Sequence, residues 1–66
     1  MKRLGIETWK DIFRNIRENG EEVEILCMDD TREWVLCCDC ELFEDGFKTE
    51  QEARERLEYL ESATTV

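Results

Sequence analysis

The sequence predicts an α+β fold in two layers, with an N-terminal helix, a two- or three-stranded antiparallel sheet and a C-terminal helix. Three observations lead to this fold class. Hydrophobic residues recur at helical spacing near both ends of the chain, they alternate with polar residues in the middle, and turn-forming residues separate these segments. A chain of 66 residues is expected to form one domain, residues 1–66, with a thin core.

The first helix is predicted over about residues 8–19. Thr8 is a suitable N-cap, and Asn19-Gly20 is a typical helix end because glycine adopts the left-handed conformation there. The apolar residues of this segment recur at i, i+3, i+4 and i+7, which defines one buried stripe. They are Trp9, Ile12, Phe13 and Ile16.

Two strands are predicted next, over about residues 22–28 and 33–43. Alternation places Trp34, Leu36, Cys38, Cys40 and Leu42 on the core face of the second strand, and Val35, Cys37, Asp39, Glu41 and Phe43 on the opposite face. The segment 33–43 is either one bent strand or two strands broken near Cys40. Glu44-Asp45-Gly46 is expected to form a tight turn, with a short third strand possible after it.

The second helix is predicted over about residues 50–61. Thr49 and Glu52 have the spacing of a capping box, in which each side chain bonds to a backbone N–H near the helix start. Ala53, Leu57 and Leu60 form the inward stripe. Residues 62–66 are expected to be a frayed tail.

The four cysteines, Cys27, Cys37, Cys38 and Cys40, do not have the paired C-x2-4-C spacing of a zinc site. Cys37 and Cys40 have C-x-x-C spacing, but they do not stand at the N-terminus of a predicted helix, where a redox role usually places this motif. We therefore expect Cys27, Cys38 and Cys40 to fill the core, and Cys37 to lie on the other face, exposed or in an interface with Val35 and Phe43. No metal and no cofactor are expected.

Charge is the strongest compositional signal, because 18 acidic residues face nine basic ones and give a net charge of −9. Residues 1–20 carry a small positive excess and residues 21–66 a large negative one. An acidic field repels nucleic acids and membranes and attracts basic protein surfaces. The absence of histidine and of any nucleophile motif indicates a protein that is not an enzyme.

We expect the acids of the strands, the 44–45 turn and the second helix to form a partner-binding surface. The candidates are Glu24, Asp39, Glu41, Glu44, Asp45, Glu52, Glu55 and Glu58. Regularly spaced carboxylates on a small rigid fold can imitate the phosphates of DNA and occupy a basic DNA-binding groove. Three alternatives remain open: a merely solvated acidic face, an adaptor that binds a partner through an apolar sheet face of Val35, Cys37 and Phe43, and a zinc-binding module.

Two resemblances bear on function. Residues 46–53, GFKTEQEA, resemble the strand-to-helix junction of the arm-binding modules of phage-type integrases, which bind DNA with basic sheet residues. Asp39 and Glu41 occupy the corresponding sheet here, so direct DNA binding does not carry over. The chain as a whole resembles, in class and without a shared motif, the small acidic anti-CRISPR proteins of phages. That resemblance implies an inhibitor that blocks target-DNA binding by a CRISPR effector of type I.

The sequence also predicts the compartment and the oligomeric state of the protein. No apolar run is long enough to span a bilayer, and no secretory signal is recognised at the N-terminus. We therefore expect a protein of the host bacterial cytoplasm with reduced thiols, present as a monomer or weak homodimer.

Overall fold

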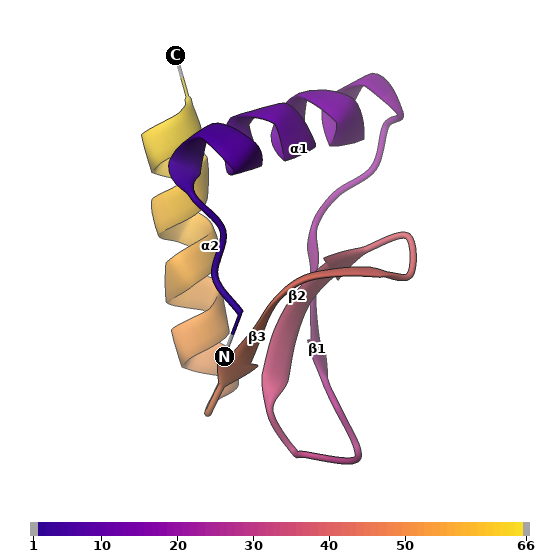
Figure 1. Ribbon diagram of the computed structural model, residues 1–66, viewed down its shortest axis with the longest axis vertical. Coiled ribbons are helices and arrows are strands. Elements are labelled where there is room, and N and C mark those ends of the chain that lie inside the picture. Colours follow the sequence, from indigo (N-terminus) through magenta and orange to yellow (C-terminus); the bar gives the residue numbers. More distant parts are fainter. Residues whose placement is uncertain (1, 66) are drawn as a thin grey trace.

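The computed structural model describes residues 2–65 and confirms the predicted α+β class (Figure 1). Its elements are α1 (Ile6–Glu18), β1 (Glu24–Cys27), β2 (Trp34–Cys38), β3 (Glu41–Phe47) and α2 (Glu50–Thr64). The three strands form one antiparallel sheet in the order β1-β2-β3. The central strand β2 therefore has neighbours on both sides.

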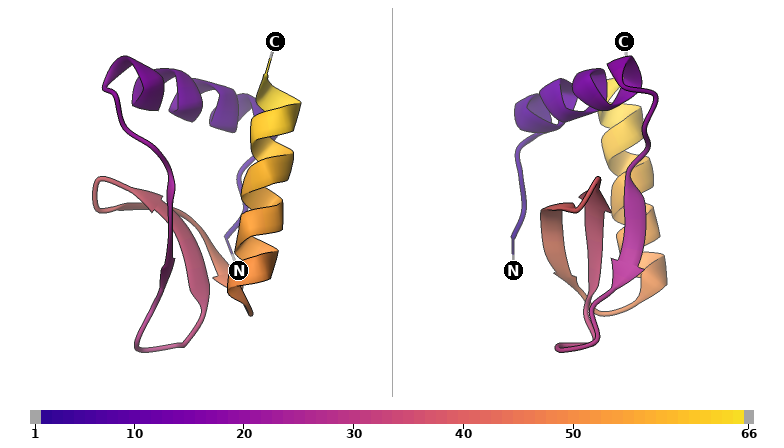
Figure 2. Two further views of the ribbon diagram at one scale, coloured as in Figure 1. Left: turned by 180° about the vertical axis from the view of Figure 1, so that it is seen from behind. Right: turned by 90° about the vertical axis from the view of Figure 1, so that its right-hand side faces the viewer.

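The two helices share one core with the sheet. Figures 1 and 2 show α2 running along the sheet and α1 crossing near the C-terminal end of α2, above the β2–β3 hairpin. Trp9 of α1 lies at the centre, with its ring 5.2 Å from that of Phe13 and 5.4 Å from that of Phe43. The buried core cluster is Trp9, Phe13, Ile16, Leu36, Cys38, Phe43, Phe47, Ala53 and Leu60.

Helix α1 begins at Ile6, so the prediction of Thr8 as N-cap was wrong. Gly5 occupies the cap position without a side-chain hydrogen bond, and the N–H of Trp9 donates to the Gly5 carbonyl at 3.1 Å. The start of α1 is fixed instead by contacts of Leu4, the residue before Gly5. The Leu4 N–H donates to Glu44, and the Leu4 carbonyl accepts from Arg56. Such partners from distant residues are invisible to a local capping rule.

The predicted end of α1 is confirmed. Gly20 has a φ of 71°, its N–H donates to the Arg17 carbonyl, and Glu21 N–H donates to the Ile16 carbonyl at 2.9 Å. This pair of bonds is a Schellman motif. It directs the chain back beneath α1, so that Glu21 lies next to the sheet.

The segment 33–43 is two strands, and the break falls at Asp39-Cys40. Both residues have positive φ, 50° and 65°, and they link β2 to β3 as a two-residue hairpin turn. Cys40 is therefore exposed in a turn and does not fill the core.

Strand β3 is irregular, which explains why simple alternation fails there. Leu36 pairs with Glu44 and Cys37 with Leu42, so Phe43 is an extra residue between two consecutive pairs. A second irregularity lies between the Trp34–Phe47 and Leu36–Glu44 pairs, where Gly46 has a φ of 80°. The predicted 44–46 turn is thus part of a bulged strand, and Phe43 packs in the core.

Helix α2 confirms Thr49 as its N-cap, because the Thr49 hydroxyl accepts from Glu52 N–H at 3.1 Å. The Glu52 carboxylate reaches back to Lys48 N–H at 3.0 Å, one residue before the position a capping box predicts. The helix continues to Thr64, so the tail predicted from residue 62 was wrong within the described residues; residue 66 lies outside them. Thr64 is buried and its hydroxyl donates to the Leu60 carbonyl.

Candidate functional site

Glu44, predicted as an exposed partner-binding acid in a turn, is the most deeply buried charged residue of the described chain. Its exposed fraction is 0%. Its Oε2 accepts from the indole N–H of Trp9 at 2.8 Å and from Leu4 N–H at 3.0 Å. Arg56 donates to both oxygens, at 3.0 and 3.2 Å. Glu44 therefore holds α1, α2 and the N-terminal segment against β3 and is excluded from the binding surface.

The environment of Glu44 keeps its carboxylate ionised. Burial is the largest single influence and opposes ionisation, but hydrogen bonds from Arg56, Leu4 and Trp9, with the charge of Arg56, together outweigh it. The net result is a Glu44 pKa below the ordinary 4.5.

Asp45 is half-buried, and its contacts also serve the fold. Its Oδ1 accepts from Lys2 N–H at 2.7 Å, and its own N–H donates to the Lys2 carbonyl. Arg3 donates to the Asp45 carbonyl and stacks on the Phe47 ring, 4.0 Å from its centroid. Residues 2–4 thus run along β3, and the predicted Asp45 site is only partly accessible.

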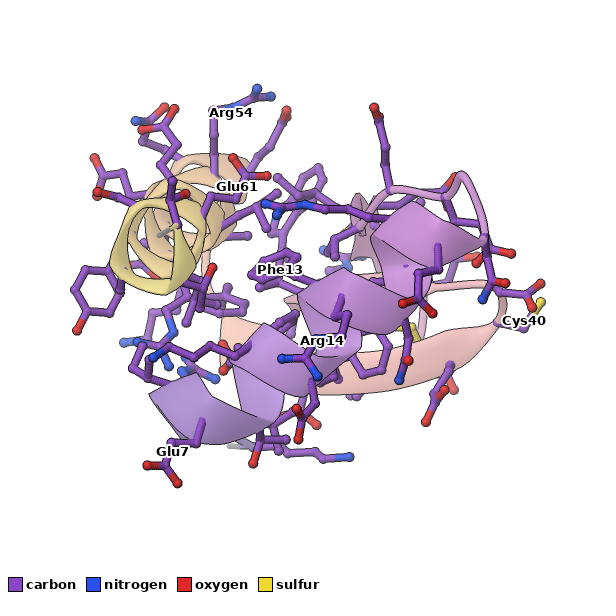
Figure 3. The ribbon with its side chains drawn as sticks, turned by 90° about the horizontal axis from the view of Figure 1, so that it is seen from above. Glu7, Phe13, Arg14, Cys40, Arg54 and Glu61 are labelled. Atoms are coloured by element: carbon purple, nitrogen blue, oxygen red, sulfur yellow. The ribbon has the colours of Figure 1, made fainter. Side chains whose placement is uncertain are left out.

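The predicted acids of α2 lie on the surface. Glu52, Glu55 and Glu58 are exposed, and Glu61 extends the same i+3 series toward the C-terminus. Neither arginine of α2 ion-pairs with this series within residues 2–65. Arg54 pairs with Glu50 at 2.5 Å, and Arg56 turns inward to Glu44. The four glutamates therefore form an acidic track; Figure 3 shows Glu61 and Arg54 on the same flank of the helix.

The remaining predicted acids, Glu24, Asp39 and Glu41, are exposed near one end of the sheet. The structure adds Glu21 and Glu22, which sequence reasoning did not select. Glu21, Glu22, Glu24 and Asp39 line one hollow, and Glu21, Glu22 and Glu61 line a second, which also contains Arg17. The sheet-end acids and the α2 track are thus connected through the loop after α1. We call this continuous surface the acidic band.

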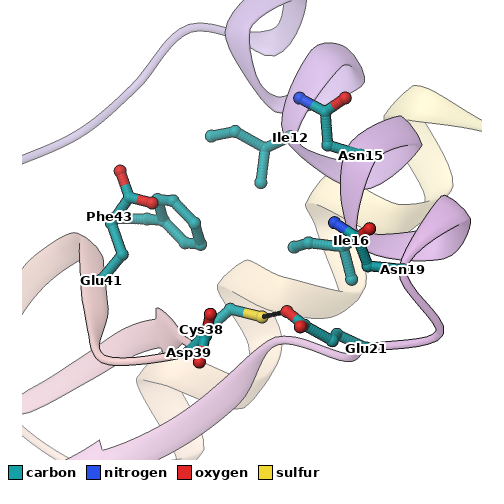
Figure 4. A pocket seen from close by; sticks show the side chains of 9 residues that line it. All are labelled: Ile12, Asn15, Ile16, Asn19, Glu21, Cys38, Asp39, Glu41 and Phe43. Carbon is teal, nitrogen blue, oxygen red and sulfur yellow. Dashed lines mark hydrogen bonds between the residues drawn. The ribbon is translucent and has the colours of Figure 1, made fainter.

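A groove of about 300 Å³ opens on the acidic band between α1 and the β2–β3 hairpin (Figure 4). Ile12, Ile16 and Phe43 give it apolar walls, and Asn15 and Asn19 lie along its α1 side. Glu21, Asp39 and Glu41 contribute three carboxylates, and Cys38 completes the lining. Among the residues that the structure describes, no basic side chain lines this groove.

Glu21 is held in place by a thiol. The Sγ–H of Cys38 donates to Glu21 Oε2 at 3.3 Å, as the dashed line in Figure 4 shows. Burial, followed by the bond to Glu21 and the nearby acids, raises the pKa of Cys38 to about 11. Cys38 therefore stays a neutral donor at physiological pH, and one Glu21 oxygen remains available for another partner.

Sequence reasoning missed Glu21 and Glu22 because their position depends on the geometry of the loop after α1. Asn19-Gly20 predicts a helix end, but the Schellman reversal that turns the next residues toward Asp39 depends on the tertiary fold. Three basic residues of α1, Lys10, Arg14 and Arg17, are exposed on one helical face. Figure 3 shows Arg14 on the outer side of α1. The same helix carries three exposed acids, Glu7, Asp11 and Glu18.

Cys38 lies in the core as predicted, but the predictions for Cys27 and Cys40 were wrong, because both are exposed. Cys37 is buried, and all four are free thiols. Burial is the main cause that raises the Cys37 pKa, with smaller contributions from Glu24 and Cys40. Within residues 2–65, no group of three or more cysteine or acidic side chains is arranged to hold a metal ion.

The predicted apolar interface of Val35, Cys37 and Phe43 does not form. Phe43 lies in the core, while Val35 and Cys37 are on the outer sheet face but are only 2% and 7% exposed. Leu26, which pairs with Val35, and Met28 are the exposed apolar side chains near that face.

Comparisons with protein-family models, with curated protein sequences and with solved structures give no significant match. A search of the described helices finds none that has the length and hydrophobicity to cross a membrane.

Proposed function

We propose that this protein is a non-enzymatic inhibitor whose acidic band occupies the basic DNA-binding groove of a protein complex in the cytoplasm of a bacterial host. The resemblance to small acidic anti-CRISPR proteins implies that this complex is a type I CRISPR effector, and we propose DNA mimicry as the mechanism. The observation that carries the proposal is the acidic track on α2, whose four glutamates are not balanced by the two arginines of the same helix.

The charge density of this track is close to that of one DNA strand. Residues three apart on an α-helix rise about 4.5 Å along its axis. Each strand of duplex DNA carries one charge per about 3.4 Å. The track thus reaches about three quarters of the linear density of a strand, and the acids of the sheet end extend it beyond the helix.

The first test is binding. Tagged protein is used as bait in lysate that contains type I effectors, and bound protein is eluted with a salt gradient. The proposal expects an effector that is released by moderate salt, because exposed charge pairs are screened over about 10 Å at 0.1 M salt. The purified effector is then mixed with labelled target duplex, and the protein is expected to displace the DNA.

The charge variant must avoid Glu44, whose reversal would test folding rather than binding. Glu55→Gln, Glu58→Gln and Glu61→Gln remove three charges from the track. The matched control removes three from α1, with Glu7→Gln, Asp11→Asn and Glu18→Gln, all exposed. At about 0.2–1 kcal/mol per exposed pair, the track variant is expected to weaken DNA displacement on the order of tenfold and the control much less. Equal loss in both variants, or no displacement by the wild type, would contradict the proposal.

The second candidate is an adaptor that binds through the outer sheet face, which Leu26 and Met28 favour because they are 48% and 40% exposed. Its partner would remain bound at high salt. Loss of that partner on Leu26→Ser, with the track variant unaffected, would select this function.

A further inference from the structure

We propose that the groove between α1 and the β2–β3 hairpin receives a single arginine side chain of the basic partner. This inference rests on the proposed function, because it assigns the residue type by which that partner anchors itself. It concerns the groove of Ile12, Asn15, Ile16, Asn19, Glu21, Cys38, Asp39, Glu41 and Phe43.

The walls of the groove match the stem of a long basic side chain. Ile12, Ile16 and Phe43 present apolar surface, which suits the methylenes of lysine or arginine. A free metal ion or an ammonium ion would not use these walls. A wholly apolar side chain would leave the carboxylates of the rim without partners and cost their desolvation.

The polar side chains at the rim of the groove favour a planar ligand group that has several N–H donors. Within residues 2–65, the side chains of Asp39 and Glu41 make no hydrogen bond or ion pair, and the Glu21 carboxylate accepts only from the Cys38 thiol. Across the groove, Asn15 of α1 and Asn19 at its C-cap contribute side-chain amides, each of which has a carbonyl acceptor. A guanidinium carries five N–H donors in a fixed fork, which lets it bond to both sides at once; an ammonium is compact and more strongly hydrated.

The rim is also held in position. The Schellman motif and the Cys38 bond fix Glu21, and the two-residue turn with positive φ at Asp39 and Cys40 fixes the hairpin end. Little side-chain ordering is then needed on the Glu21 side when the arginine enters. Buried arginines at the centre of an interface are frequent energetic hot spots.

The experiment is an NMR titration of the full chain, labelled with ¹⁵N, with the blocked peptide acetyl-Gly-Arg-Gly-amide. Three peptides serve as controls: one with citrulline, which keeps the shape but lacks the charge, one with lysine, and one with a guanidinium on a stem two methylenes shorter. The amide signals of Asn15, Asn19, Asp39 and Glu41 are expected to shift in a saturable way with arginine. Citrulline should give no saturable shift, and the lysine and short-stem peptides should bind more weakly, by a factor of about five.

Two double variants distinguish arginine binding in the groove from attraction to the acidic surface in general. Asp39→Asn with Glu41→Gln is expected to weaken arginine-peptide binding by at least about fivefold, while Glu55→Gln with Glu58→Gln, which removes the same charge outside the groove, should leave it unchanged. Equal effects of both double variants, or shifts spread along α2, would overturn the inference.

The outcomes also separate this inference from the proposed function. Saturable arginine binding without DNA displacement from any effector would retain the groove and reject the DNA mimic. DNA displacement that is unaffected by Asp39→Asn with Glu41→Gln, and no arginine binding, would reject the groove alone.

Discussion

The buried Glu44 carboxylate provides the sharpest test of how this fold is stabilised. Glu44→Gln keeps the size of the side chain but removes its charge. The glutamine amide would present two N–H groups where Trp9, Leu4 and Arg56 all donate. At least one buried donor then loses its acceptor, and the Arg56 guanidinium loses its counter-ion.

The magnitude follows from these contacts. Removing one partner of a buried ion pair costs about 3–5 kcal/mol. A 66-residue domain has a total stability of only about 3–10 kcal/mol. The variant is therefore expected to be close to unfolding at 25 °C. The measurement is urea denaturation followed by tryptophan fluorescence and circular dichroism, with Glu58→Gln as the exposed control, expected within about 0.5 kcal/mol of the wild type.

The pH dependence gives an independent check. The pKa of Glu44 is lower in the folded than in the unfolded chain, so its contribution is present above the unfolded value of 4.5 and is lost as pH falls through the folded value. Wild-type stability should drop in acid, and Glu44→Gln should lack that part of the drop. A loss below about 1 kcal/mol at neutral pH, with an unchanged acid profile, would refute the assignment of Glu44 as the central ion of the fold.

Three further predictions concern the cysteines. Cys40→Gly should raise stability by about 1 kcal/mol in urea denaturation, because Cys40 has a φ of 65° that glycine adopts without strain; a loss of stability would contradict the hairpin geometry. N-ethylmaleimide at neutral pH should modify the exposed Cys27 and Cys40 quickly and the buried Cys37 and Cys38 only on unfolding, as read by peptide mass spectrometry. The Cys38 pKa of about 11 lies above the ordinary 9.0, so stability should decline as pH rises from 9 toward 11, and Cys38→Ala should flatten that decline.

The helices were predictable because their signals are local. The stripe of α1, its end at Gly20 and the cap at Thr49 each depend on residues within one or two turns of one another. The helix bounds shifted where distant contacts decide them, at Leu4 beside Glu44 and at Thr64 packed near α1. The acidic track on α2 was predictable for the same reason, since only helical periodicity is needed to place Glu55 and Glu58 outward.

Strand β3 was not predictable, because alternation assumes a regular ladder. The extra residue at Phe43 turns the side chains of both Phe43 and Glu44 toward the core. The identities of these two residues do not predict this irregularity. Gly46 was the one local sign of a bulge, but Asp-Gly is equally typical of a hairpin turn. The groove was also beyond sequence reasoning, since it joins Asn19 to Asp39 across the loop after α1 and two strands.

The position of Glu44 explains how the surface field arises. The buried Glu44 carboxylate requires a positively charged partner, and Arg56 turns inward to pair with it. The other arginine of α2, Arg54, pairs with Glu50. The cations of α2 are thus engaged in pairs, and the negative excess is carried by the outer glutamates. Among the exposed basic residues, Lys10, Arg14 and Arg17 lie on α1, and Lys2, Arg3, Arg32 and Lys48 lie on other parts of the chain. The acidic band attracts a basic partner, so electrostatic steering favours approach with the band first. The same orientation presents the groove beside Asp39 to the partner, which is where an arginine anchor must enter.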